Sequence, residues 1–130
     1  MTAREIISAA HIKCTKQRIA VLEIMMSATA PMTAEQIFAS VSGMSLSTVY
    51  RILDCFCKNN IATGESIQNS SELYYALVSN RHRHFAICLG CHKMKYVDVC
   101  PVHDMSVDNF KITGHKLELY GYCDECEKIQ

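Results

Sequence analysis

Two pairs of cysteines carry the clearest chemistry in this sequence: Cys88-Leu-Gly-Cys91 and Cys123-Asp-Glu-Cys126. Each C-x-x-C spacing places two thiolates at the ends of one tight turn, which suits two corners of a metal tetrahedron. Two such turns together make a closed four-thiolate site, and closed sites of this kind are typical of structural zinc. A disulfide or a thiol-redox pair is the alternative. We predict that all four cysteines bind one structural zinc ion.

A second group of metal-ligand side chains lies close to the first pair. His82 and His84 alternate, so on a strand both imidazoles would point the same way and could bind one ion. Cys100 and His103 add a thiol and an imidazole a short distance downstream. We predict a regulatory metal site at His82, His84 and His103, with Cys100 either a ligand or an ordinary inward-facing thiol. The remaining histidines have no partner in the pattern and are predicted to be structural or exposed: His11, His92 and His115.

The elements that position these groups fall into two kinds, and the first half of the chain is helical. Thr15 can cap a helix that runs to about Ala28, and Pro31 then interrupts the chain. The segment 33–36 has the sequence of a capping box, so a second helix begins there and ends near residues 42–43. A third helix is predicted from about Ser47 to Asn60. Its apolar side chains fall in one arc, wide enough to face a core: Leu46, Val49, Ile52, Leu53 and Phe56.

Two short β-prone runs follow the third helix, at residues 61–67 and 73–77, with turn-forming residues between them. Helices followed by a two-stranded hairpin are typical of a winged helix-turn-helix. We therefore predict that residues 1–78 form a winged-helix DNA-binding domain. Its candidate contacts to bases and phosphates lie on the third helix, at Ser47, Thr48, Tyr50 and Arg51, and near the start of an earlier helix, at Lys16 and Arg18. The alternative for each is an ordinary solvent-exposed side chain.

The second half of the chain is strand-rich. Residues 78–81 are the best hinge, and strands are predicted at 84–87, 94–99 and 116–122, with one short helix over 101–110. Residues 79–130 thus read as a small α/β domain with the cysteine pairs at its edge. The fold class is α+β, with two domains.

Composition limits the function classes. The 130 residues have zero net charge, and the charges balance in each half, which is not the footprint of a strongly basic nucleic-acid binder. Any DNA contact must therefore depend on local placement of charge, on a bound cation or on dimerisation. The first ten residues lack the apolar core of a signal peptide, and no apolar run is long enough for a membrane span. We expect a cytoplasmic protein with reduced thiols and no membrane partner.

Several segments together resemble the ferric uptake regulator (Fur) family of metal-dependent bacterial repressors. They are residues 15–19 (TKQRI), 33–38 (TAEQIF), 47–53 (STVYRIL), 82–91 (HRHFAICLGC) and 114–126 (GHKLELYGYCDEC). The resemblance implies a winged-helix DNA-binding domain, a C-terminal dimerisation domain and structural zinc on the four cysteines. It also implies a regulatory metal bound between the domains, with His82 and His84 contributing to the site. Metal binding would order a homodimer so that it binds a two-fold DNA operator. Cys100 followed by the 114–121 segment looks most similar to the zinc-sensing (Zur) branch.

The sequence departs from the family pattern at several ligand positions. Non-ligand side chains stand where relatives carry ligands: Pro31, Tyr75, Leu77 and Tyr122. The two histidines would then need other partners, among them His103, Cys100, Asp98, Glu72 or Glu65. We expect a metal-responsive repressor of metal-uptake genes with zinc as the favoured signal. The alternatives are a response to iron, manganese or peroxide, or a metal-insensitive regulator. An enzyme is not expected, since the H-x-E and P-C-x-x-C signature of zinc deaminases is missing.

Overall fold

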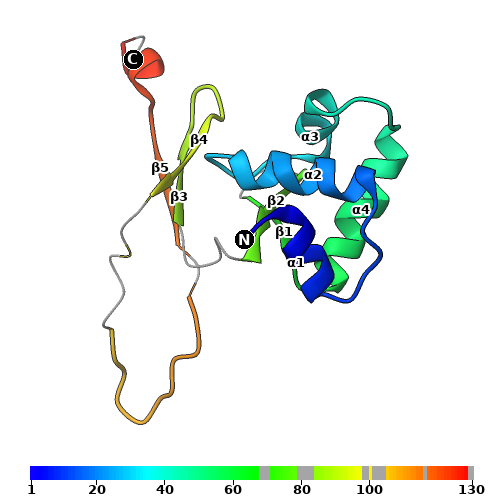
Figure 1. Cartoon of the computed structure of the whole chain (residues 1–130). Coiled ribbons are helices and arrows are strands. Elements are labelled where there is room, and N and C mark those ends of the chain that lie inside the picture. Colours follow the sequence, from blue (N-terminus) through cyan, green and yellow to red (C-terminus); the bar gives the residue numbers. More distant parts are fainter. Residues whose placement is uncertain (68–70, 79–83, 98–99, 101–104, 116, 129–130) are drawn as a thin grey trace. The chain divides into compact units, whose positions relative to one another are not determined.

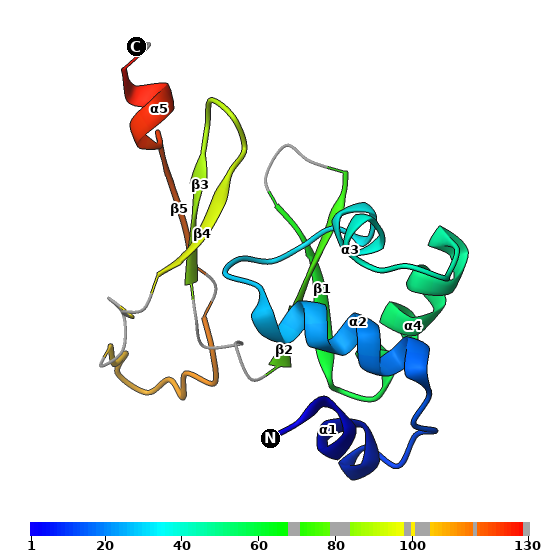
Figure 2. The ribbon, with the colours of Figure 1, turned by 45° about the horizontal axis from the view of Figure 1, so that its top comes forward.

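The computed structural model describes residues 1–67, 71–78, 84–97, 100, 105–115 and 117–128. The chain forms two compact units, Met1–Arg81 and His82–Gln130 (Figures 1 and 2). The predicted hinge falls largely on residues 79–83, outside the described residues, so the predicted boundary after residue 78 stays a prediction. Within the described part of the chain, no helix has the length and apolarity needed to cross a membrane.

The first unit contains four helices: α1 (Ala3–Ala9), α2 (Lys16–Ser27), α3 (Ala34–Ser40) and α4 (Leu46–Lys58). Each begins where a hydroxyl side chain accepts a hydrogen bond from a backbone N–H in the first turn, as N-caps do; the caps are Thr2, Thr15, Thr33 and Ser45. The helix after Thr15 and the capping box at Thr33 agree with prediction. In that box Gln36 N donates to Thr33 Oγ1 at 3.1 Å, and Thr33 N donates to Gln36 Oε1 at 2.9 Å.

Helix α4 begins one residue before the predicted start. The cause is Ser45, whose hydroxyl accepts from Thr48 N at 3.2 Å and so brings Leu46 into the first turn. The predicted apolar arc faces the core, with four of its five members buried and Leu46 packed against them: Val49, Ile52, Leu53 and Phe56. These side chains pack with apolar residues of the other three helices, including Ile7, Leu22 and Ile37.

A two-stranded hairpin completes the first unit, as predicted. Strands β1 (Ala62–Ser66) and β2 (Leu73–Leu77) pair antiparallel, with Gly64 opposite Tyr75. A Cβ on Gly64 would lie 3.0 Å from Cε1 of the Tyr75 ring. The absence of a side chain at Gly64 therefore leaves room for this ring. Backbone hydrogen bonds also join Tyr75 to Met32, just before α3. Tyr75 therefore helps to hold the wing on the helical core, together with the buried side chains of Ala62 and Leu77.

The second unit contains a three-stranded sheet and one short helix: β3 (His84–Cys88), β4 (Met94–Val97), β5 (Glu118–Gly121) and α5 (Asp124–Glu127). The predicted strands are present. The predicted helix over 101–110 is absent from its described part, residues 105–110; residues 101–104 lie outside the described residues. Val107 and Phe110 instead form an isolated bridge around a turn in which Asn109 has a φ of 59°. That left-handed conformation is incompatible with a continuing α-helix.

The strand order β4-β3-β5 determines which chain segments meet. β3 pairs antiparallel with β4, with His84 opposite Val97, and parallel with β5, with Cys88 opposite Gly121. The start of β3, the end of β4 and the start of β5 therefore lie at one end of the sheet. The end of β3, the turn into β4 and the end of β5 lie at the other (Figure 1). Metal-ligand side chains are found at both ends.

Candidate metal centres and nucleic-acid interface

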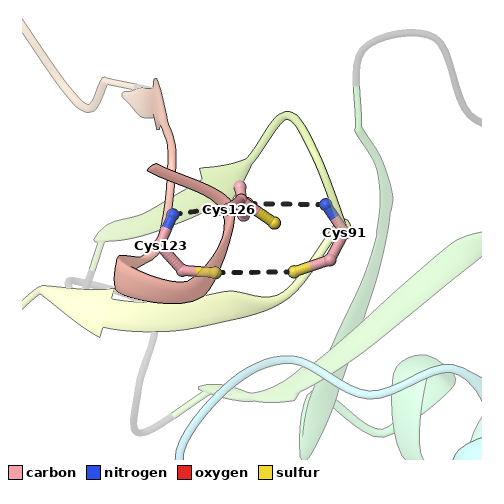
Figure 3. Close-up of side chains that lie close together, drawn as sticks. Cys91, Cys123 and Cys126 are labelled. Atoms are coloured by element: carbon pink, nitrogen blue, oxygen red, sulfur yellow. Dashed lines mark hydrogen bonds between the residues drawn. The ribbon is translucent and has the colours of Figure 1, made fainter. Parts of the chain in front are cut away.

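The four predicted zinc ligands form one cluster at the far end of the sheet. Cys88 ends β3, Cys91 follows in the turn, Cys123 comes after β5, and Cys126 lies in α5. Their sulfur atoms all lie within 4.8 Å of one another. The thiols of Cys91 and Cys123 face each other at 3.7 Å (Figure 3). A zinc tetrahedron with bonds of about 2.3 Å has S···S edges of about 3.8 Å, so the cluster has the size to hold zinc.

Backbone groups prepare one of these thiols for metal binding. Cys123 N and Cys91 N donate to Cys88 Sγ at 3.4 and 3.5 Å. These hydrogen bonds lower the pKa of Cys88 to about 6, so it is a thiolate at neutral pH. Hydrogen bonds to the Cys88 and Cys123 sulfurs raise the pKa of Cys126 to about 12. A metal ion entering the cluster would displace the Cys126 proton.

The first C-x-x-C turn passes very close to α5. A Cβ on Gly90 would lie 2.8 Å from Cys126 Sγ, which is shorter than real Cβ contacts. The absent side chain at Gly90 therefore lets the turn and the helix bring their sulfurs together. This close approach joins two segments that the sequence places far apart.

A second cluster lies at the opposite end of the sheet, where His84, Cys100 and His115 meet. Cys100 Sγ is 3.3 Å from Nε2 of each histidine, and the two Nε2 atoms are 3.0 Å apart. Tetrahedral zinc would hold such atoms about 3.6 Å (N to S) and about 3.4 Å (N to N) apart. The observed spacings are a few tenths of an ångström shorter. The three side chains have the types and positions to hold a metal ion and would leave a fourth position open.

This cluster changes the picture drawn from the sequence. The structure brings the predicted ligand His84 together with Cys100, for which the sequence allows either a ligand or an inward-facing thiol. It also adds His115, for which sequence reasoning found no partner. His115 joins the cluster because of the strand topology. Parallel pairing of β5 with β3 places the residues before β5 beside the start of β3. Two predicted ligands, His82 and His103, lie outside the described residues, so their roles stay predictions.

The non-ligand residues that the resemblance places at ligand positions are Pro31, Tyr75, Leu77 and Tyr122. Pro31, Tyr75 and Leu77 are buried in the first unit, where Tyr75 and Leu77 belong to the hydrophobic core. Tyr122 is exposed between β5 and α5. The described cluster is built from the second unit alone, without these positions.

The predicted DNA-contact residues of α4 lie on its solvent side. Ser47, Tyr50 and Arg51 are exposed, and Thr48 is half-buried. The Tyr50 hydroxyl donates to Glu35 Oε1 of α3 at 2.8 Å. That bond stabilises the protonated phenol and raises the pKa of Tyr50. A carboxylate from the preceding helix thus holds the most exposed aromatic group of this face.

A polar hollow of about 350 Å³ lies where the segment before α2 meets α4. Arg18 Nη1 donates to Lys13 O at 2.7 Å, and Arg51 Nη2 donates to Thr48 Oγ1 at 3.3 Å. Lys16 is exposed and is not part of the lining. Lys13 was not predicted as a contact, because it lies before the start of α2. The hollow is lined by Lys13, Thr15, Gln17, Arg18, Thr48, Arg51 and Ile52.

Comparison with known proteins agrees with this architecture. The model of the ferric uptake regulator family matches residues 9–120. The peroxide operon regulator of Bacillus subtilis (strain 168) is 32% identical over 135 residues, which span 97% of this chain and 92% of the relative. A ferric uptake regulation protein of Staphylococcus epidermidis is 30% identical over 124 residues, 90% of this chain and 88% of the relative.

Among solved structures, the ferric uptake regulator of Helicobacter pylori superposes with a TM-score of 0.73 at 25% identity, over 95% of this chain and 88% of that one. The match extends through both units. With a family model that spans most of the sequence and relatives that align along nearly its whole length, this chain belongs to the ferric uptake regulator family.

Proposed function

We propose that the protein is a metal-responsive transcriptional repressor that binds operator DNA as a homodimer. The observation that carries the proposal is the second cluster, His84–Cys100–His115, which is distinct from the four-thiolate site. A closed four-thiolate shell has no open position for a signal, whereas a three-ligand shell does. One site would therefore hold the fold together and the other would report on metal supply.

In this proposal the four cysteines bind structural zinc. Among the described residues of the second unit, few side chains are buried, and the main hydrophobic cluster belongs to the first unit. A structural metal ion commonly stabilises a domain with so small a hydrophobic core. It would also let the second unit serve for dimerisation.

Zinc is the proposed signal at the second cluster. Two imidazoles and one thiolate suit zinc, while iron or manganese regulation would favour oxygen ligands. His82 or His103 would supply an exchangeable fourth ligand, so this position would open more readily than any in the four-thiolate shell. Metal binding would order the dimer for operator binding, and the repressed genes would be those for zinc uptake.

The first unit is the proposed DNA-binding part. α3 and α4 form the helix-turn-helix, with Tyr50 and Arg51 aimed at the major groove and Ser47 at its margin. The hollow between Arg18 and Arg51 has the charge and size to accept a backbone phosphate. Lys16 would contact the backbone beside it. Local charge thus compensates for a net charge of zero.

A peroxide response is the second candidate, because the relative from Bacillus subtilis is a peroxide operon regulator. If that response worked by metal-catalysed oxidation of a histidine, it would need a redox-active metal, because zinc has no redox chemistry. The cysteine in the present cluster favours zinc over that arrangement.

The test begins with a metal count on the full-length protein after mild chelation. Zinc, manganese or iron is then added while binding to an operator fragment, selected from random DNA with the zinc-loaded protein, is followed. One retained zinc ion, with a second that switches DNA binding, would support the proposal. If iron or manganese alone switches binding, the zinc assignment fails. If DNA binding is the same with and without every metal, the protein is a metal-insensitive regulator.

A further inference from the structure

Cys100 differs from the four cysteines of the structural site in its surroundings. Its sulfur lies 3.3 Å from Nε2 of His84 and 3.3 Å from Nε2 of His115. The side chain is half-buried, and residue 115 on one side of it is exposed. A small reactant can therefore approach the sulfur at the open side of the cluster.

The chemistry of the three ligands is unequal. Zinc has no redox chemistry of its own, so a zinc-loaded site cannot oxidise a histidine through the metal. A thiolate, in contrast, reacts directly with peroxides. Among the three ligands only the cysteine can respond to an oxidant while zinc is bound.

We propose that Cys100 is an oxidation-sensitive ligand, so that a hydroperoxide releases the sensory zinc and lifts repression. This inference rests on the proposed sensory role of the cluster. The Cys100 thiolate sulfur attacks the distal peroxide oxygen, an S–O bond forms and the O–O bond breaks. The sulfur loses two electrons to give a sulfenic acid, and the peroxide is reduced to water or an alcohol as its leaving oxygen takes up a proton.

The oxidised cluster would bind zinc poorly. Sulfenylation removes the only anionic ligand of the described cluster and leaves two imidazoles. Changing even the outer partners of a metal ligand typically costs roughly 10–100-fold in affinity, so changing the ligand itself should cost at least as much. The described cluster contains no second thiol. The sulfenic acid would therefore be returned to the thiol by a small-molecule thiol, through a mixed disulfide.

The structural site should react more slowly. A bound zinc ion would occupy all four thiolates there, and Cys88 is buried and accepts two backbone N–H hydrogen bonds, which make its sulfur less nucleophilic, although Cys91 is exposed. The remaining thiols, Cys14, Cys55 and Cys57, lie in the first unit outside both clusters. Oxidation should therefore begin at Cys100.

The experiment uses the full-length protein loaded with two zinc ions per chain and treated with a small excess of hydrogen peroxide. Zinc release is followed with a chromogenic chelator, sulfenic acid is trapped with dimedone, and the modified residue is located by peptide mass spectrometry. The matched variant is Cys100→His, which keeps a zinc ligand but removes the thiol. We expect the wild-type protein to release one zinc ion and to carry the dimedone tag on Cys100. In the variant, zinc bound before treatment should stay bound after peroxide is added, and no dimedone tag should appear at position 100.

Oxygen found on His84 or His115 with Cys100 unmodified would overturn the inference, and so would tagging at the structural cysteines before Cys100. The tag on wild-type Cys100 is read directly, so the inference remains testable even if the variant folds poorly. A wild-type chain that binds only one zinc ion would instead overturn the sensory site itself. Two bound zinc ions with an unreactive Cys100 would overturn only the oxidation step.

Discussion

The Tyr50 hydroxyl of α4 donates a hydrogen bond to the Glu35 carboxylate of α3, with the two oxygens 2.8 Å apart. The bond spans the turn of the helix-turn-helix and fixes an exposed phenol on the side proposed to meet DNA. The Glu35 carboxylate also places a negative charge next to the proposed DNA-binding surface. This carboxylate orients the phenol and opposes phosphate, so it should increase selectivity more than affinity.

Replacing Glu35 with Gln should lower the pKa of Tyr50 toward its ordinary value of 10.0. A carboxylate acceptor favours the protonated phenol over the phenolate and so raises the pKa, and an amide does this much less. The measurement is ultraviolet titration of phenolate. Since the chain has six tyrosines, the Tyr50→Phe variant identifies the contribution of this one. If the titration curves of wild type and Glu35→Gln coincide, the hydrogen bond is not present in solution.

Removing Arg51 should weaken operator binding by about 1–3 kcal/mol. Arg51 lines the polar hollow and is held toward Thr48. The control is Lys58→Ala, at the other end of α4, where the ammonium pairs with Asp54 at 3.0 Å. Fluorescence anisotropy over a range of salt concentrations separates the two kinds of contact. A uniform loss with a shallower salt slope indicates phosphate, and a loss for operator DNA alone indicates base readout. Equal effects of Arg51→Ala and Lys58→Ala would contradict the proposed interface.

Replacing His115 with Ala should abolish zinc-dependent DNA binding and leave the structural zinc in place. The variant removes one of three described ligands at the sensory end of the sheet, and no cysteine is touched. His92→Asn is the control, because His92 has a φ of 65° and Asn tolerates that conformation. Zinc content and DNA binding are measured on both variants. Normal zinc-dependent binding by His115→Ala would remove this residue from the site.

Cys123→Ser should unfold the second unit and spare the first. The first unit has its own hydrophobic core, while the second is proposed to depend on zinc. Structural zinc contributes about 10 kcal/mol or more to folding in small domains. Circular dichroism should retain the helical signal, because α1–α4 lie in the first unit. Sedimentation should show monomers and metal analysis no tightly bound zinc. A dimer that persists in this variant would mean that dimerisation does not depend on the zinc clamp.

The sequence was most informative where the physics is local. Hydroxyl caps at Thr15 and Thr33, and the apolar arc of α4, predict helices because the groups that form them lie within one or two turns. The four cysteines were identifiable for a similar reason, since each pair carries its own turn. The helix expected over 101–110 failed in its described part, where Asn109 adopts a left-handed conformation that no local pattern marked.

The sensory cluster could be predicted only in part. His84 was recognisable beside His82, but its partners Cys100 and His115 come from segments whose proximity depends on strand order and direction. Such non-local pairing leaves no spacing rule in the sequence. Once β5 is known to run parallel to β3, the position of His115 follows.

Strand β3 begins with His84 of the sensory cluster and ends with Cys88 of the structural one. The four steps of about 3.3 Å between residues 84 and 88 keep the two sites roughly 13 Å apart, too far to share a ligand. The two sites should then differ in how long a bound metal ion stays at each. A complete four-thiolate shell must break a metal–sulfur bond before any competitor can enter, whereas a shell with an exchangeable fourth position lets a competitor bind first. In the proposed assignment, one zinc ion would remain for the life of the protein, while the other, at the opposite end of the same strand, would exchange with the cell.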